Sequence, residues 1–214
     1  MKSHYNKHYY FWQKRLETFG AQIDLWKFEK LIKKGDIILD FGCGAGSILE
    51  KLNCKKRYGI EINPYAVKDA EKKGITVFRS IRGIPQKLKF DAIISHHALE
   101  HTENPFAILV SLKNRLKRGG LMIWVVPIDD WRIQKKFQPE DIHKHLYAWN
   151  PQLLGNLFLH SGYKIREVKI LTHAWIPFSQ IFFKILPKNI YYLLCRIWSI
   201  VTLNRQIRIV AVNG

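Results

Sequence analysis

The chain has 214 residues, enough for one domain with a full hydrophobic core, and its composition, 47% hydrophobic and 24% charged, excludes a largely disordered protein. Its formal net charge of +18 points to a nucleic acid, an anionic membrane surface or a phosphorylated substrate, unless it only reflects a lysine-rich composition. The three cysteines, Cys43, Cys54 and Cys195, form no C-x-x-C pair, so we expect reduced thiols, a cytoplasmic setting and no zinc site.

The chain shows no targeting or membrane-spanning pattern. No apolar stretch follows the first ten residues, so we expect no secretory signal peptide. Residues 175–203 form the most apolar segment, but two prolines and three basic residues interrupt it, leaving less than the roughly 18 continuous apolar residues of a membrane span. We therefore expect no transmembrane helix.

Residues 1–35 predict a helical flank before the first strand. Apolar residues recur there at steps of three and four, as on one face of a helix. This face consists of Trp12, Leu16, Phe19, Ile23 and Trp26. Gly20 lies within this pattern, and we expect it to break or bend the helix.

A run of apolar residues ends at Asp40-Phe41 and opens into three alternating glycines, Gly42, Gly44 and Gly46. Glycine reaches positive φ and lets a ligand lie against the main chain, and the first N–H groups of a following helix are unpaired. The pattern predicts a strand, a turn and a helix that bind a nucleotide-like cofactor. A dinucleotide fingerprint needs its third glycine five residues after the first, which this chain lacks. The alternative is a turn whose small residues serve packing alone.

A second acid supports the cofactor interpretation. Glu61 ends the next expected strand, 21 residues after Asp40, where an acid binds ribose hydroxyls in nucleotide-binding α/β folds. Farther along, Gly119-Gly120 is expected to cap the helix 105–117, and 206–212 is expected to form an antiparallel edge strand. The expected strands are 37–41, 57–61, 75–78, 90–95, 121–126, 164–171 and 206–212. Strands that alternate with helices in this way predict a doubly wound, mostly parallel sheet that binds its ligand at the carboxyl ends of the strands.

Five segments in combination resemble the class I S-adenosylmethionine-dependent methyltransferases, in particular bacterial members that act on small molecules. These segments are 40–46, 59–63, 90–101, 117–127 and 145–163. The resemblance covers roughly residues 30–172 and implies a Rossmann-like α/β fold with a seven-stranded sheet and helices on both faces. We expect a single domain over 1–214. Its parts are the flank 1–35, a cofactor-binding core 36–172, an aromatic and basic insertion 173–205 and an edge strand 206–214.

The resemblance also implies a set of residues that bind S-adenosylmethionine. The glycine turn would cradle the methionine portion, with Asp40 near its ammonium, and Glu61 would hold the ribose. The family commonly has an acid after its third strand for the adenine amino group, whereas this chain has Ser80-Ile81 there. The implied residues are Asp40, Gly42, Cys43, Gly44, Gly46, Glu61, Ile62, Ser80, Ile81, Ser95 and His96.

Methyl transfer from a sulfonium depends mainly on alignment, so the enzyme needs no metal and no nucleophile of its own. An oxygen or carbon acceptor usually needs a base near pH 7, and histidine suits that task. The candidates are His97, His101 and His145, with His143 as a further histidine in the same region. A capping or packing role is the alternative for each of them.

The acceptor that we predict is a small molecule or a glycan or lipid precursor, methylated at oxygen. An RNA-directed enzyme and a non-catalytic cofactor-binding subunit are the alternatives. Nucleic acid is disfavoured, because Ser95-His96-His97-Ala98 differs from the Asn/Asp-Pro-Pro-aromatic motif of amino-methylating enzymes. Aromatic residues beside bases in 175–203 favour peripheral contact with an anionic membrane at its cytoplasmic face. A dimer contact, an acceptor pocket and plain core packing remain alternatives for this segment.

Overall fold

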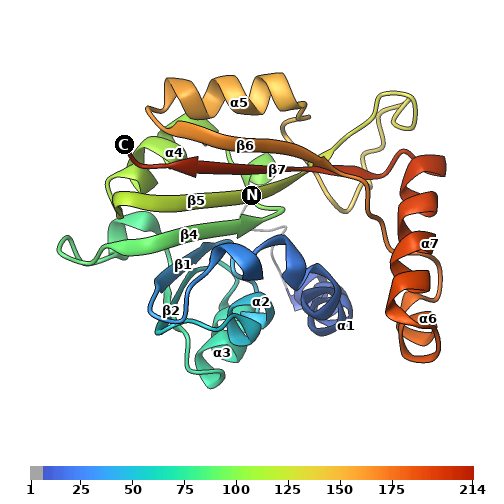
Figure 1. Cartoon of the computed structure of the whole chain (residues 1–214), viewed down its shortest axis with the longest axis horizontal. Helices are drawn as coiled ribbons and strands as arrows, with labels where there is room; N and C mark the ends of the chain where they lie inside the picture. The colour runs from blue at the N-terminus through green and yellow to red at the C-terminus, as the bar shows by residue number, and fades with distance from the viewer. Residues whose placement is uncertain (1–6) are drawn as a thin grey trace.

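The computed structural model describes residues 7–214, without the side chains of residues 7–9, 12, 13, 15 and 16. Trp12 and Leu16 of the expected helical face therefore lie outside the described side chains. The described chain forms one seven-stranded sheet in the order β3-β2-β1-β4-β5-β7-β6 (Figure 1). The strands are β1 (Ile37–Phe41), β2 (Lys56–Ile60), β3 (Thr76–Phe78), β4 (Phe90–His96), β5 (Leu116–Ile128), β6 (Lys164–Leu171) and β7 (Arg205–Val212). The first five strands run parallel to one another, which confirms the predicted α/β fold class.

The position of β7 corrects the prediction of an edge strand at 206–214. β7 lies between β5 and β6 and pairs antiparallel with both, so β6 is the edge of the sheet. Ile207, Ile209 and Ala211 are fully buried on it. A strand with neighbours on both sides and packing on its faces has little polar sequence. The apolar character of 206–212 therefore fits an interior strand.

Two hydrophobic cores cover the two faces of the sheet because side chains alternate along each strand. Leu39 and Trp124 point to the core that contains α4 and α5. Their neighbours Ile38 and Ile123 point to the core that contains α2 and α3. The helices therefore cover both faces, as the sequence predicts.

The helices begin at recognisable signals. The described helical segments are α1 (Lys7–Asp24), α2 (Ser47–Lys51), α3 (Pro64–Lys72), α4 (Pro105–Lys113), α5 (Pro151–His160), α6 (Ser179–Ile185), α7 (Lys188–Val201) and the 3₁₀ turns η1 (Leu25–Lys27), η2 (Glu29–Leu31), η3 (Ile81–Gly83) and η4 (Leu99–His101). Three of them start with Asn-Pro, and Asn63, Asn104 and Asn150 each accept a hydrogen bond from a backbone N–H of the first turn. The asparagine replaces a missing backbone partner, and proline loses no hydrogen bond at this position.

Two glycine predictions are wrong. α1 runs through Gly20 to Asp24, and a Cβ at Gly20 would lie 2.6 Å from the Trp175 ring, so this glycine serves close packing. α4 ends at Lys113, and both Gly119 and Gly120 lie within β5. There Gly119 takes a φ of +74° and donates its N–H to the carbonyl of Asn213.

The insertion 173–205 forms the helical pair α6–α7, which stands beyond the carboxyl ends of the parallel strands (Figure 1). One side of the pair packs against α1 through a small core of Ile23, Phe183, Tyr191 and Cys195. Among the described residues, no helix has both the length and the hydropathy that crossing a bilayer requires.

Candidate active site

The glycine turn joins β1 to α2 in the conformation that its sequence predicts. Gly42, Gly44 and Gly46 have φ angles of +77°, +54° and +76°. A Cβ at Gly42 would lie 2.6 Å from the Ala98 Cβ, and one at Gly46 would lie 2.3 Å from the Ile75 Cδ1. Both the backbone conformation and the surrounding space therefore require glycine at these two positions.

Three carboxylates converge on this turn. Asp40 is buried, and its Oδ1 has no hydrogen-bond partner among the described residues. Glu61 accepts a hydrogen bond from the backbone N–H of Gly44 at 3.0 Å. It also accepts hydrogen bonds from the backbone N–H groups of Ile62 and Asn63, the two residues after it. Glu17 of α1 accepts a hydrogen bond from the N–H of Ser47 at 3.3 Å.

Burial raises the pKa of each of these three carboxyl groups, and their mutual repulsion raises the pKa of Asp40 further. The pKa of Asp40 lies well above its usual value. A cation bound beside the turn would relieve both the repulsion and the missing interaction of Asp40. The turn therefore suits a ligand that carries an ammonium or a sulfonium.

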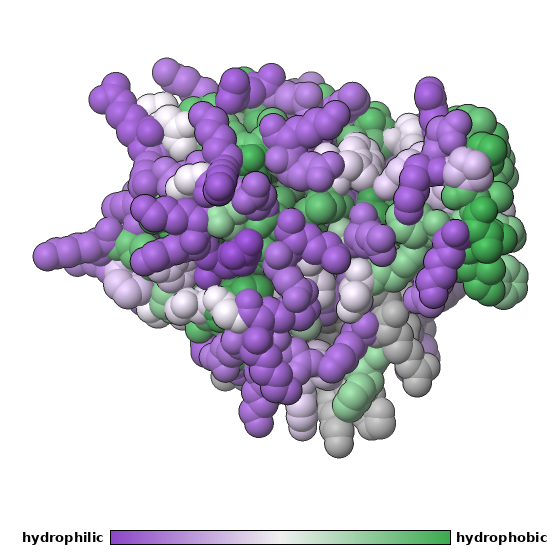
Figure 2. All heavy atoms as spheres, turned by 60° about the horizontal axis from the view of Figure 1, so that its bottom comes forward, coloured by the Kyte–Doolittle hydropathy of each residue, from purple (hydrophilic) through white to green (hydrophobic). Residues whose placement is uncertain are grey.

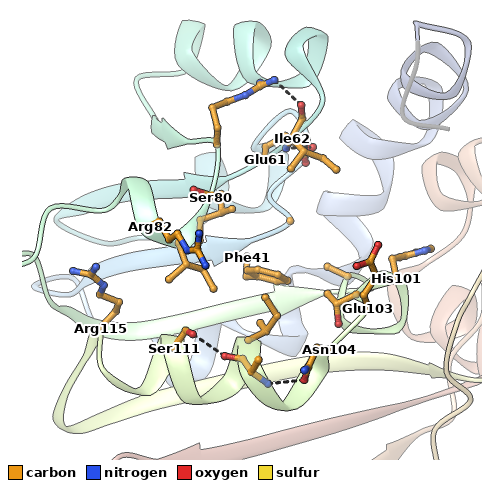
Figure 3. A pocket seen from close by; sticks show the side chains of 18 of the residues that line it. Phe41, Glu61, Ile62, Ser80, Arg82, His101, Glu103, Asn104, Ser111 and Arg115 are labelled. Carbon is orange, nitrogen blue, oxygen red and sulfur yellow. Dashed lines mark hydrogen bonds between the residues drawn. The ribbon is translucent and has the colours of Figure 1, made fainter. Parts of the chain in front are cut away.

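A cavity of about 1250 Å³ opens beside the turn (Figure 3). Its walls come from the ends of β1 and β2, the segment after β3, the segment after β4 and one side of α4 with the residues that follow it. Residues predicted to bind the cofactor or to act in catalysis that line it are Gly42, Glu61, Ile62, Ser80, Ile81, His97 and His101. The carboxyl ends of the strands thus meet at a space large enough for a cofactor and an acceptor.

One corner of the cavity lies after β3, where the resemblance leads us to expect an acid and the chain has none. This corner is lined by Ile62, Arg79, Ser80 and Ile81. The Arg79 guanidinium donates a hydrogen bond to the carbonyl of Ile62 at 2.6 Å. This bond joins the segments after β2 and β3, and it leaves the half-exposed Ile62 side chain at the rim. The exposed apolar side chain of Ile62 can therefore pack against a flat ring of a bound ligand.

Other predicted cofactor residues lie behind the cavity wall. Asp40, Cys43, Gly44 and Gly46 belong to the turn but are absent from the wall, and the Cys43 side chain packs against Gly59. The Ser95 hydroxyl donates to the carbonyl of Phe41 at 2.8 Å. His96 lies 3.0 Å from the Nζ of Lys27. Neither Ser95 nor His96 lines the cavity, so their roles as cofactor contacts stay predictions.

The three predicted catalytic histidines lie in one cluster. His97 has a φ of +53°, which is unusual for a residue with a Cβ, and its buried Nε2 has no partner among the described residues. Burial lowers the pKa of His97 well below its usual value, and the neighbouring His96 and Lys27 lower it further. The rings of His101 and His145 lie 4.9 Å apart. His143 in turn lies 5.4 Å from His145.

Two acids in this cluster escaped the sequence analysis. Glu100 lies fully buried in η4, and Asp129 accepts a hydrogen bond from the Nδ1 of His145 at 2.8 Å. Burial lowers the pKa of His145, but the bond to Asp129 and nearby carboxylates outweigh it and raise the pKa overall. One signal could have identified Glu100, because it directly precedes His101, a predicted base. Its contact with the region of His145 could not be predicted, because the two residues are far apart in the sequence.

A buried ion pair contacts His96, the residue before His97 of the histidine cluster. The Nζ of Lys27 in η1 is fully buried and lies 2.8 Å from the Oδ1 of Asp24 and 2.6 Å from the Oε1 of Gln206. It also contacts His96 at the end of β4. Burial lowers the pKa of Lys27, whereas Asp24 raises it in part. The lysine thus ties the N-terminal helical flank to β4 and β7.

This sheet order defines a class I methyltransferase, together with an acid near the end of β1, a glycine turn after β1 and a second acid after β2. Comparison with known families agrees. Residues 5–168 match the family model described as a methyltransferase domain, and the chain belongs to this family. The cofactor of the family is S-adenosylmethionine, which fits the unpartnered Asp40 and the carboxylates around the turn.

Similar curated proteins differ in what their names say they methylate. The chain is 31% identical over 120 residues to a ubiquinone biosynthesis O-methyltransferase of Cereibacter sphaeroides, covering 50% of this chain and 47% of that protein. It is 22% identical over 200 residues to the mRNA cap guanine-N(7) methyltransferase of Saccharomyces cerevisiae, covering 78% of this chain and 44% of that protein. The chain therefore spans less than half the length of these two relatives. An uncharacterised protein of Methanocaldococcus jannaschii is 36% identical over 152 residues, which is 70% of each chain.

Solved structures share the fold. A S-adenosylmethionine-dependent methyltransferase from Archaeoglobus fulgidus superposes with a TM-score of 0.66 over 97% of this chain and all of that one, at 20% identity. Phosphoethanolamine N-methyltransferase 2 of Haemonchus contortus was solved with S-adenosylmethionine. It superposes with a TM-score of 0.59 over 89% of this chain and 51% of that one, at 14% identity. At these identities the likeness concerns the fold.

Proposed function

We propose that the protein transfers the methyl group of S-adenosylmethionine to an oxygen atom of a small molecule or of a glycan or lipid precursor. The observation that carries this proposal is the juxtaposition of two groups of side chains. Three carboxylates with raised pKa values surround the glycine turn, and a histidine cluster lies across the adjoining cavity. The first group suits a cationic methyl donor, and the second suits a hydroxyl acceptor.

Residues of the chain provide orientation and a place for the acceptor's proton. Alignment of donor and acceptor can supply much of the rate of such a displacement. Glu61 holds the turn, and Ile62 with Ile81 offers an apolar surface at the rim of the cavity. His97 lines the cavity, and its Nε2 has no partner among the described residues, so this nitrogen is our candidate to accept a proton from an acceptor hydroxyl.

The name of the Cereibacter sphaeroides relative, an O-methyltransferase, supports an oxygen acceptor. A decisive experiment incubates the purified chain with labelled S-adenosylmethionine and separate lipid, polar-metabolite and RNA fractions of a cell extract. We expect label in the lipid or small-molecule fraction, and mass spectrometry of the product then locates the methyl group. Label confined to RNA would overturn the acceptor class while leaving the cofactor assignment intact.

The acceptor class includes lipid-linked molecules because α6 and α7 present an apolar surface. Figure 2 shows hydrophobic side chains gathered at the edge of the molecule that these helices form, with hydrophilic side chains nearby. The exposed apolar residues of this surface are Phe178, Ile181, Ile185, Ile190, Leu193, Leu194, Ile197, Trp198, Ile200 and Val201. Lys184, Lys188 and Arg196 are the charged residues of the same two helices. An apolar face edged by cations matches an interfacial helix on anionic lipid.

We therefore propose a cytoplasmic protein that binds peripherally to the inner face of the membrane through α6–α7. Flotation with vesicles that contain anionic lipid tests this at low salt. The variant Ile185→Ser with Val201→Ser should float less than wild type, whereas Leu159→Ser, which changes an exposed leucine of α5, should float as wild type does. Failure of the wild-type protein to float would remove the membrane proposal.

A second candidate, methylation of RNA, is favoured by the net charge of +18 and by the name of the Saccharomyces cerevisiae relative. Binding to RNA that weakens steeply as salt rises would support it. A third candidate is a cofactor-binding subunit without catalysis. It would bind S-adenosylmethionine and label none of the three fractions.

A further inference from the structure

Glu100 is a buried acid that the proposed methyl transfer does not use. Its side chain is 0% exposed, and both carboxylate oxygens have no hydrogen-bond partner among the described residues. A buried polar group without a partner destabilises a fold, and a carboxylate does so more than a neutral group. A ligand that pairs with Glu100 would remove this cost.

Histidines surround this carboxylate. One ligand atom each from Glu100, His101 and His145 all lie within 4.8 Å of one another. The Nδ1 of His97 is 3.8 Å from the Oε1 of Glu100. The ligands of a tetrahedral ion with bonds of about 2.1 Å lie about 3.4 Å apart, so small side-chain rotations suffice to close the cluster around one ion.

Other contacts already hold His145 in the orientation of a metal ligand. Its Nδ1 bonds to Asp129 at 2.8 Å, which leaves Nε2 as the ring atom available for coordination. Metal-binding histidines usually have their second nitrogen bonded to a carboxylate in this manner. The backbone N–H of Leu146 donates to the carbonyl of Glu100 at 2.8 Å and keeps the two segments together.

We propose that Glu100, His101 and His145 bind one divalent transition-metal ion, with Asp129 orienting His145. Two imidazoles and one carboxylate favour Zn²⁺ or Fe²⁺ over Mg²⁺ or Ca²⁺, which prefer oxygen ligands alone. His101 also lines the cavity, so an open coordination position on that side would face the acceptor. If the proposed methyl transfer holds, the ion would coordinate the oxygen of the acceptor and favour its deprotonation.

This proposal departs from the expectation of no metal site, which considered only the cysteine pattern and the chemistry of methyl transfer. The two halves of the site are 44 residues apart in the sequence, and only the fold brings them together. The segment 127–149 contributes Asp129 and His145, so it forms one wall of the proposed site.

Zn²⁺ titration of the chelator-treated, dialysed full chain tests the proposal, with a chromophoric chelator as competitor. We expect one equivalent to bind, and Mg²⁺ not to compete. Glu100→Gln and His145→Gln should each weaken binding at least tenfold, and Asp129→Asn should weaken it about 10- to 100-fold. The control His160→Gln changes an exposed histidine of α5 and should bind as wild type does.

Circular dichroism and S-adenosylmethionine calorimetry on the same preparations separate the possible failures. Wild type that binds no stoichiometric Zn²⁺, or His145→Gln that binds like His160→Gln while folded, would overturn the metal site. S-adenosylmethionine binding without Zn²⁺ binding would refute only the metal site. Zn²⁺ binding without S-adenosylmethionine binding would support the site and refute only the proposed methyl transfer.

Discussion

The carboxylate of Glu61 accepts a hydrogen bond of 3.0 Å from the backbone N–H of Gly44. The acid that follows β2 and the turn that follows β1 therefore hold each other in place. Two further bonds, from the N–H groups of Ile62 and Asn63, fix the carboxylate itself. Glu61 thus shapes the cofactor site even before any ligand contacts it.

Replacing Glu61 by glutamine should weaken S-adenosylmethionine binding about 10- to 100-fold, because hydrogen bonds to a charged group contribute about 1.5–3 kcal/mol. Glutamine keeps the size of the side chain but loses the charge and one acceptor. Calorimetry measures the change. Glu71→Gln, on the exposed face of α3, is the matched control, and equal affinities of the two variants would refute the role of Glu61.

Gly46→Ala should destabilise the fold more than Gly74→Ala. The two glycines have nearly equal φ angles of +76° and +75°, so the backbone penalty of about 1–2 kcal/mol is shared. A Cβ at Gly46 would also lie 2.3 Å from Ile75, whereas one at Gly74 has nothing within 4 Å. Overpacking adds about 1–3 kcal/mol for Gly46→Ala alone. Urea unfolding gives both values, and equal losses would show that Ile75 moves aside freely.

Local signals in the sequence predicted most of the fold. The glycine turn, the acids Asp40 and Glu61 and the Asn63-Pro64 helix start depend on residues that are close together in the chain. Their conformations follow from backbone sterics and nearby hydrogen bonds. For that reason the strands, the turn and the class of fold could be read without coordinates.

Long-range packing explains what the sequence could not predict. Gly20 looked like a helix breaker because its partner, Trp175, is more than 150 residues away. Lys27 is buried only because η1 lies against the ends of β4 and β7. Glu100 and His145 meet through the path of the segment after β5. No local pattern encodes any of these neighbours.

Lys27→Met should lower the free energy of unfolding by about 3–5 kcal/mol, because it leaves Asp24 buried without its cation. The double variant Lys27→Met with Asp24→Asn should recover part of the loss by removing the uncompensated charge. Urea unfolding at pH 7 measures both. Lys30→Met, at an exposed position, should change little, and a similarly small effect of Lys27→Met would show that the pair is not needed.

The pH dependence of stability should include a contribution from His173. Burial lowers its pKa to about 4, although Asp24 raises it in part. As the pH falls from about 6.5 toward 4, the unfolded chain takes up a proton at His173 that the folded chain does not, so stability falls over this window. The free energy of unfolding of His173→Gln should therefore fall less steeply as the pH decreases. By pH 4 its loss should be smaller than that of wild type by up to about 3 kcal/mol. Parallel stability curves for the two proteins would contradict this.

The interior position of β7 has a consequence for the order in which the sheet forms. β5 and β6 come earlier in the chain but are not neighbours, and each bonds to β7. The edge strand β6 therefore has no strand to pair with until residues 205–212 form β7. We expect hydrogen exchange during refolding to protect β6 no earlier than β7, so the last strand in the sequence controls when the sheet is complete.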